Sequence, residues 1–203
     1  MNWQEFTALL VLATAMSFSP GPNTTLSTAL AANHGLKRAM PFVCAVPAGW
    51  SALLSLCALG TGGLVLAVPL LGLAIKGAGV AYLLWLAFKM AQPLMPDRAS
   101  SSCAEVTFWQ GAALQFVNIK AWILALTIVS GWIAGYSDAG LRFAVVLPVM
   151  LVYAFVSNLT YALAGSLLRD WLAGPAGSRQ RLLVFNRLMA MLLVVTALWM
   201  LFL

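Results

Sequence analysis

The stretch Ser19-Pro20-Gly21-Pro22-Asn23 interrupts an apolar segment that is long enough to cross a membrane. Each proline lacks an amide hydrogen and clashes with the preceding turn, and the glycine between them adds backbone freedom, so an α-helix must break here. Pro22 suits the first position of a new helix, which predicts a half-helix from about Asn23 onward with unpaired amides at its start. Such a helix end attracts an anion.

Composition places this break inside a membrane protein. Of the 203 residues, 63% are hydrophobic and only 8% are charged, against about 25% charged in an ordinary soluble domain. Apolar runs of roughly 20 or more residues recur to the C-terminus, which predicts helical spans rather than a barrel. A broken helix at membrane depth is tolerated only where its freed backbone groups are buried in protein or line a watery cavity. The break therefore predicts a substrate site near the bilayer midplane, the alternative being a proline kink that neighbouring helices satisfy.

Six spans are expected, and they fall into two halves. Their ranges are about 3–34, 39–59, 66–91, 105–135, 141–168 and 188–203, with a polar loop at 93–104. The first and fourth spans are the longest, and each contains a polar interruption that ends in an asparagine, Asn23 or Asn118. The second and fifth each contain an internal proline.

This correspondence predicts an all-α integral membrane protein with a single transporter domain over residues 1–203. Six transmembrane helices would form two three-helix repeats, at about 1–92 and 105–203, with spans one and four broken near the midplane. Because three is odd, the two repeats must be inverted relative to each other in the bilayer, as in many transporters.

Loop charge predicts the orientation of these spans. The loops after spans one, three and five contain most of the basic residues, namely Lys37, Arg38, Lys89, Arg98, Arg169, Arg179, Arg181 and Arg187. The opposite side has only Arg142 and Lys76. By the positive-inside rule, both termini should face the periplasm from a bacterial cytoplasmic membrane.

Lys120 is the most informative charge in the chain. It lies fifteen residues beyond Glu105, roughly 22 Å along a helix, and so well inside an apolar span. A cation is costly at that depth and normally marks a function. The structural alternative is a lysine that pairs with the carbonyls of a helix end.

Carboxylates are absent from every expected span interior. The five acidic residues, all at span ends or in loops, are Glu5, Asp97, Glu105, Asp138 and Asp170. A divalent-metal site needs several oxygen ligands, usually acidic, and a carrier of cationic amino acids would be expected to offer a counter-charge. Both are therefore disfavoured. A buried cation and half-helix amides instead fit the carboxylate of a small, otherwise neutral solute.

The candidate substrate-binding residues lie at the two interruptions and on aromatic side chains of the spans. They are Pro20, Gly21, Pro22, Asn23, Thr24, Gln115, Asn118, Lys120, Trp50, Trp122 and Tyr153. The solute carboxylate is expected at Lys120 and the half-helix amides. Its ammonium group is expected at exposed carbonyls, at the side chains of Asn23 and Asn118, or on an aromatic face. Interface anchoring or packing is the alternative for each aromatic residue.

Other classes of protein lack support in the sequence. Cys44, Cys57 and Cys103 form no CxxC or Cys/His spacing, so neither a disulfide framework, a metal site nor a cofactor is indicated. A membrane enzyme or thiol-electron carrier would need such a constellation, and a scaffold without transport would leave Lys120 unexplained. The net charge of +6 lies in loops between spans and argues for orientation rather than nucleic-acid binding. Gly131-xxx-Gly135 allows close approach of a neighbouring span or of a second subunit in a homodimer.

The PGPN motif resembles the first-span signature of the LysE-type amino-acid exporters, the lysine/threonine/homoserine family. His34-Gly35 with the basic residues that follow it, the segment 79–86 and Asn118-Ile119-Lys120-Ala121 match further family signatures in order and spacing, and the resemblance covers the whole chain. It implies an inner-membrane carrier that exports amino acids or close derivatives, with the proton-motive force as the driving force. Residues 107–109 and 114–120 resemble the branch that exports cysteine and O-acetylserine.

Two positions depart from the family pattern. Many members have proline between the asparagine and the lysine of span four, where this chain has Ile119, so a milder unwinding of the second break is expected. Many also have an aspartate after a glycine in span two, where this chain has Gly49-Trp50, so proton coupling would need another group or transport would be facilitative. The expected function is export of small neutral amino acids, either cysteine/O-acetylserine-like or threonine/homoserine-like, by alternating access. Export of basic amino acids is the alternative.

Overall fold

The computed structural model describes residues 1–60, 68–92, 106–174 and 180–202, and within these ranges the regular structure is entirely helical. The elements are α1 (Trp3–Phe18), α2 (Pro22–His34), α3 (Leu36–Ala58), α5 (Pro69–Ala91), α6 (Phe108–Val117), α7 (Ile119–Ile128), a short π-helical segment η1 (Val129–Ile133), α8 (Ala139–Ala173) and α9 (Gln180–Leu201). The predicted all-α class is confirmed for these ranges. The predicted polar loop at 93–104 lies outside them.

Four of the described helices, α3, α5, α8 and α9, are long and apolar enough to cross a membrane. A fifth span is formed if α6 and the α7–η1 segment, which meet at a bend of 68°, count as one broken helix. Helices α1 and α2 have 16 and 13 residues, fewer than the roughly 20 that a single crossing needs. The chain is thus a multi-pass membrane protein with four to five candidate spans by length and composition.

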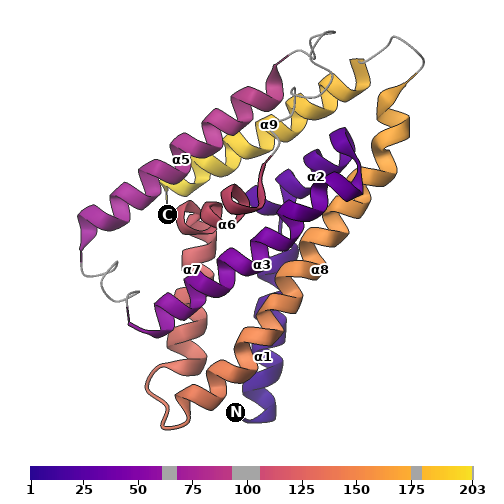
Figure 1. Cartoon of the computed structure of the whole chain (residues 1–203). Helices are drawn as coiled ribbons and strands as arrows, with labels where there is room; N and C mark the ends of the chain where they lie inside the picture. The colour runs from indigo at the N-terminus through magenta and orange to yellow at the C-terminus, as the bar shows by residue number, and fades with distance from the viewer. Residues whose placement is uncertain (61–67, 93–105, 175–179, 203) are drawn as a thin grey trace.

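The helices form two apolar cores that meet at the level of the breaks. The first core joins α2, the start of α3, the end of α5 and α9, with Leu26, Phe42, Leu86 and Leu193 fully or almost fully buried. The second core joins α1, the end of α3, α7 and the start of α8. Figure 1 shows α5 and α9 side by side along one edge, and α8 running the full length of the molecule past α2 and α3.

Three glycines let the backbones of two helices come into direct contact. The closest approach is at Gly79 of α5, where a Cβ would lie 2.0 Å from the carbonyl oxygen of Val117 at the end of α6. A Cβ on Gly49 of α3 would lie 2.3 Å from the carbonyl oxygen of Ala112 on α6, and one on Gly165 of α8 would lie 2.2 Å from that of Thr28 on α2. Any side chain at these positions would push the helices apart. Gly131 and Gly135 differ, because a Cβ on either would have no neighbour within 4 Å among the described residues. The expectation that they pack a neighbouring span of the same chain is therefore wrong for the described part.

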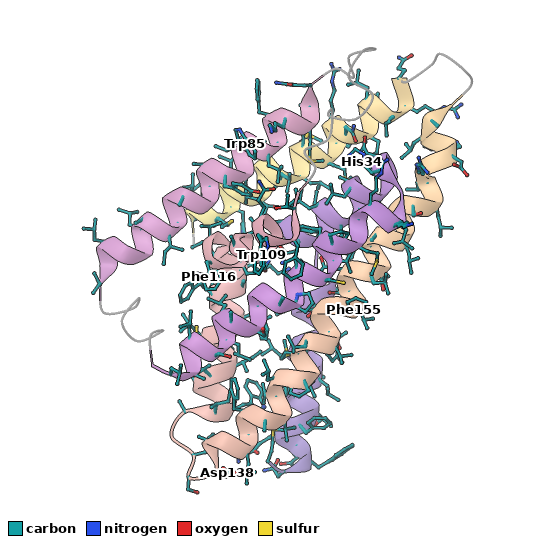
Figure 2. The ribbon with its side chains drawn as sticks, viewed as in Figure 1. His34, Trp85, Trp109, Phe116, Asp138 and Phe155 are labelled. Atoms are coloured by element: carbon teal, nitrogen blue, oxygen red, sulfur yellow. The ribbon has the colours of Figure 1, made fainter. Side chains whose placement is uncertain are left out.

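A cluster of charges ties the start of α1 to the start of α8. The Arg142 guanidinium donates to Asp138 at 2.7 Å and to Glu5 at 3.1 Å, and the Trp132 indole donates to the Glu5 carbonyl at 2.8 Å. The hydrogen bond from Arg142 holds the pKa of the Asp138 carboxyl below its usual value. Figure 2 places Asp138 at the opposite end of the molecule from His34, so this cluster closes one end of the helix assembly.

Candidate functional site

The first break has the form that the Pro-Gly-Pro sequence predicts. Helix α1 ends at Phe18, and α2 begins at Pro22 with Gly21 as its N-cap. Because Gly21 has no side chain, the Thr24 hydroxyl holds the turn by accepting from the Gly21 amide at 3.0 Å and donating to the Gly21 carbonyl at 3.1 Å. The predicted half-helix is confirmed, and its first-turn amides have no N-cap side chain as a partner.

The second break is sharper than the sequence suggested. Helix α6 ends at Val117, Asn118 is extended, and α7 begins at Ile119 after a bend of 68°. The Asn118 side chain caps α7 by accepting from the Lys120 amide at 3.1 Å. The Trp122 indole donates to the Phe116 carbonyl at 2.8 Å and so satisfies the freed end of α6. The expected milder unwinding is wrong, because side-chain capping replaces the missing proline.

The two helix breaks lie next to each other, and side chains of one contact the other. The Lys120 ammonium donates to the carbonyl oxygen of Ser19 at 3.0 Å and to its hydroxyl at 2.7 Å. The side-chain amides of Asn23 and Gln115 bind each other reciprocally, at 2.9 and 3.2 Å. Lys120 thus pairs with a helix-end carbonyl, as the structural alternative stated, and it does so at the edge of a cavity.

The cavity between the breaks has a volume of about 60 Å³ and opens among α1, α2, α3, α7 and α8. Seven of the eleven candidate residues line it: Gly21, Pro22, Asn23, Thr24, Trp50, Asn118 and Lys120. Four other candidates, Pro20, Gln115, Trp122 and Tyr153, do not line it. Pro20 is exposed, Gln115 and Trp122 hold the breaks as described, and the Tyr153 hydroxyl accepts from Thr14 at 3.0 Å.

The structure adds residues that sequence reasoning missed. Ser157 and Asn158 on α8 line the same cavity and are 1% and 3% exposed. Ser17 and Ser19 add polar atoms, and the apolar wall consists of Met16, Val46, Ala121, Leu124, Met150 and Ala154. Asn158 was detectable as a polar residue in the middle of an apolar span. Ser157 was not, because a serine in a span commonly bonds its own helix.

The described side chains that line the cavity carry positive charge but no negative charge. Lys120 is the only charged side chain of this lining, and none of the lining residues is acidic. Among the described residues, no group of three or more His, Cys, Asp or Glu side chains could hold a metal ion. The cavity therefore has the chemistry to bind an anionic group beside neutral polar atoms.

Comparison with known proteins gives one family. The family model described as LysE type translocator matches residues 14–202. A cysteine/O-acetylserine efflux protein of Klebsiella pneumoniae subsp. pneumoniae is 29% identical over 160 residues, which cover 79% of this chain and 81% of the relative. The protein of the same name in Escherichia coli K12 is 32% identical over 158 residues, with 77% and 78% covered. No solved structure matches.

Proposed function

The chain belongs to the LysE type translocator family, and we propose that it exports small neutral amino acids by alternating access around the cavity between its helix breaks. Family membership confirms the resemblance found at the PGPN motif and identifies a transporter rather than an enzyme. Cysteine, O-acetylserine and similar compounds are the proposed cargo, because the relatives that cover most of the chain are named for the efflux of those two solutes.

The observation that supports this proposal most is the position of the Lys120 ammonium. It lies at the cavity surface, and its described partners are two neutral oxygen atoms of Ser19. A cation at this depth is costly without a counter-charge, and none of the lining residues supplies one. A lysine ammonium has three donors, so one remains for the carboxylate of an amino acid while the Ser19 contacts persist.

The start of α2 supports the same assignment. Pro22, Asn23 and Thr24 form the first turn of this half-helix and line the cavity. The amides at a helix start carry a partial positive charge and favour an anion. Lys120 and the α2 terminus thus act on the same group of the solute from two sides.

Basic amino acids fit this cavity less well than neutral ones. A second cation on the solute would lie near Lys120 in a cavity whose described lining has no carboxylate. Repulsion between like charges is strong where water is excluded. Trp50 and Met150 further restrict the length of the solute side chain.

The proposed architecture has six spans in the inner membrane. Helices α1 and α2 together make the first span, and α6 with α7 and η1 makes the fourth, so α3 and α5 of the first repeat correspond to α8 and α9 of the second. The start of α3, the end of α8 and the start of α9 gather at one end of the molecule (Figure 1). These helix ends carry the basic residues Lys37, Arg38, Arg169 and Arg181. The positive-inside rule makes this the cytoplasmic end and puts both termini in the periplasm.

Two expectations about partners are retained within this proposal. Among the described lining residues Lys120 is the one ionisable side chain, so coupling to the proton-motive force would use either its amine or a group outside the cavity. Gly131 and Gly135 are exposed, which leaves them free for a second subunit in a homodimer.

Counterflow in proteoliposomes tests the proposed function. The full chain is reconstituted into vesicles loaded in turn with cysteine, O-acetylserine, serine, threonine, lysine or arginine, and the uptake of labelled L-cysteine is followed under reducing conditions with and without a pH gradient. We expect counterflow with the small neutral solutes and none with lysine or arginine. Counterflow with lysine would overturn the assignment of a neutral cargo, and absence of counterflow with every amino acid would overturn the proposed function.

A further inference from the structure

The cavity has a second group of polar side chains in its wall. Lys120 offers hydrogen-bond donors to a solute, whereas this group offers acceptors. The group is formed by Ser157 and Asn158, adjacent residues of α8 that are 1% and 3% exposed. Two buried polar side chains in the wall of an otherwise apolar helix are costly unless each polar atom has a partner. Their partners show which of their atoms remain available to a solute.

The Ser157 hydroxyl and one N–H of the Asn158 side-chain amide are directed back to their own helix. The Ser157 hydroxyl donates to the Ala154 carbonyl at 3.3 Å, and the Asn158 side-chain amide donates to the same carbonyl at 2.8 Å. The Ser27 hydroxyl of α2 donates to the Asn158 side-chain oxygen at 2.9 Å. Both lone pairs of the Ser157 hydroxyl, one lone pair of the Asn158 oxygen and the second N–H of the Asn158 amide therefore remain unused.

Other polar side chains of the lining are already engaged. Asn23 is paired with Gln115, Thr24 closes the turn at Gly21, and Asn118 caps α7. The side-chain oxygens of Asn23 and Asn118 each accept one bond and keep one lone pair, so the expectation that they receive the ammonium group of the solute stays a prediction. Ser17 is only partly buried, and the α8 pair keeps more unused lone pairs than either asparagine.

We propose that Ser157 and Asn158 bind the α-ammonium group of the solute, so that the cavity selects zwitterions over simple carboxylates. This inference rests on the proposed function. Lys120 and the start of α2 present donors to the carboxylate, and the α8 pair presents neutral acceptors to the ammonium group. Hydrogen bonds in which one partner is charged are the stronger ones. A solute that lacks the ammonium group would leave these acceptors without a partner.

The test measures selectivity between two competitors of labelled L-cysteine counterflow in proteoliposomes containing the full chain. One competitor is unlabelled L-cysteine, and the other is 3-mercaptopropionate, which has the same thiol and carboxylate but no ammonium group. For the wild-type protein we expect cysteine to inhibit at a concentration at least about 30-fold lower. For Ser157→Ala, inhibition by cysteine should weaken about tenfold while inhibition by 3-mercaptopropionate stays unchanged.

Two further variants distinguish binding from a structural role. Asn158→Asp keeps the acceptor for Ser27 and loses the donor to the Ala154 carbonyl. It adds a negative charge that attracts an ammonium group, so the preference for cysteine should rise. Thr160→Val is the matched control, because Thr160 is an exposed residue of α8 whose hydroxyl bonds the Val156 carbonyl. Its preference should equal that of the wild-type protein.

The outcomes separate this inference from the proposed function. Equal weakening of both competitors in Ser157→Ala, or an unchanged preference in Asn158→Asp, would overturn the ammonium assignment while amino-acid transport stands. Absence of counterflow with any amino acid in the wild-type protein would overturn the proposed function and the ammonium assignment together.

Discussion

The Lys120 ammonium donates to two oxygen atoms of Ser19, at 2.7 and 3.0 Å, across a separation of 101 residues. This contact joins the start of α7 to the chain between α1 and α2, and so connects the two helix breaks directly. It also places the positive charge of Lys120 against the backbone carbonyl of Ser19, directly before the PGPN turn. A solute that binds Lys120 therefore acts on both breaks at once.

We expect Lys120→Met to reduce cysteine counterflow at least about 30-fold, because loss of one partner of a buried charge interaction costs roughly 2 kcal/mol or more. The variant should still insert and elute as a single species in detergent, since Ser19 keeps its own bond to the Met16 carbonyl. Lys76→Met is the matched control. The Lys76 ammonium bonds the Leu201 carbonyl outside the cavity, and this variant should transport normally. Normal counterflow by Lys120→Met would remove Lys120 from the site.

Gly21→Ala should impair transport without unfolding the protein. A Cβ on Gly21 would lie 3.3 Å from the Lys120 ammonium nitrogen, so the flexible end of the lysine must shift by a few tenths of an ångström. Its φ of −175° is open to alanine, so the backbone is not strained. We expect the concentration of cysteine for half-maximal counterflow to rise about three- to tenfold, a change of roughly 1 kcal/mol.

The control for this substitution is Gly140→Ala, because a Cβ on Gly140 meets no atom of the described residues within 4 Å. Its counterflow and thermal midpoint should match those of the wild-type protein. If Gly21→Ala also leaves counterflow unchanged, then the geometry of the Lys120 ammonium at the PGPN turn does not govern binding.

The first break followed from local rules, and the second did not. Pro-Gly-Pro removes two amide donors within three residues, which no helix accommodates, whereas single prolines at 41, 47 and 148 lie inside continuous α3 and α8. At Ile119 no backbone rule requires a break. The break is instead held by Asn118 and by the Trp122 indole, and such side-chain contacts are not visible in a hydropathy pattern.

The sequence could not predict that Ser157 and Asn158 of α8 line the cavity, and the reason differs from that for the second break. Asn158 was visible as a polar residue in an apolar span, but its direction depends on how α8 is rotated against α2. That rotation is set by the contact between Gly165 and the Thr28 backbone and by the bond from Ser27. The depth of Lys120, in contrast, depended only on its distance from the start of the span.

The cluster at the start of α8 predicts a stability that depends on acid pH. The hydrogen bond from Arg142 lowers the pKa of Asp138 in the folded state. A lowered pKa contributes stability above the unfolded value of about 3.9, and this contribution is lost as the pH falls through the folded pKa. We expect the thermal midpoint in detergent to fall more between pH 6 and pH 3 for the wild-type protein than for Asp138→Asn. Asp170→Asn, at an exposed residue near the other end of α8, should retain the wild-type pH dependence.

A double-mutant cycle on Asn23 and Gln115 tests whether the two breaks are one mechanical unit. The two amides bind each other reciprocally, and Gln115 is fully buried. Replacing Asn23 by leucine leaves the buried Gln115 amide with only its bond to the Gly111 carbonyl. Replacing Gln115 leaves the partly buried Asn23 amide without this partner. Each loss should cost about 1–3 kcal/mol. Because the double variant leaves no orphaned amide, its destabilisation should be smaller than the sum of the single losses. The measurement is the thermal midpoint in detergent, and strictly additive losses would show that the pair does not couple the breaks.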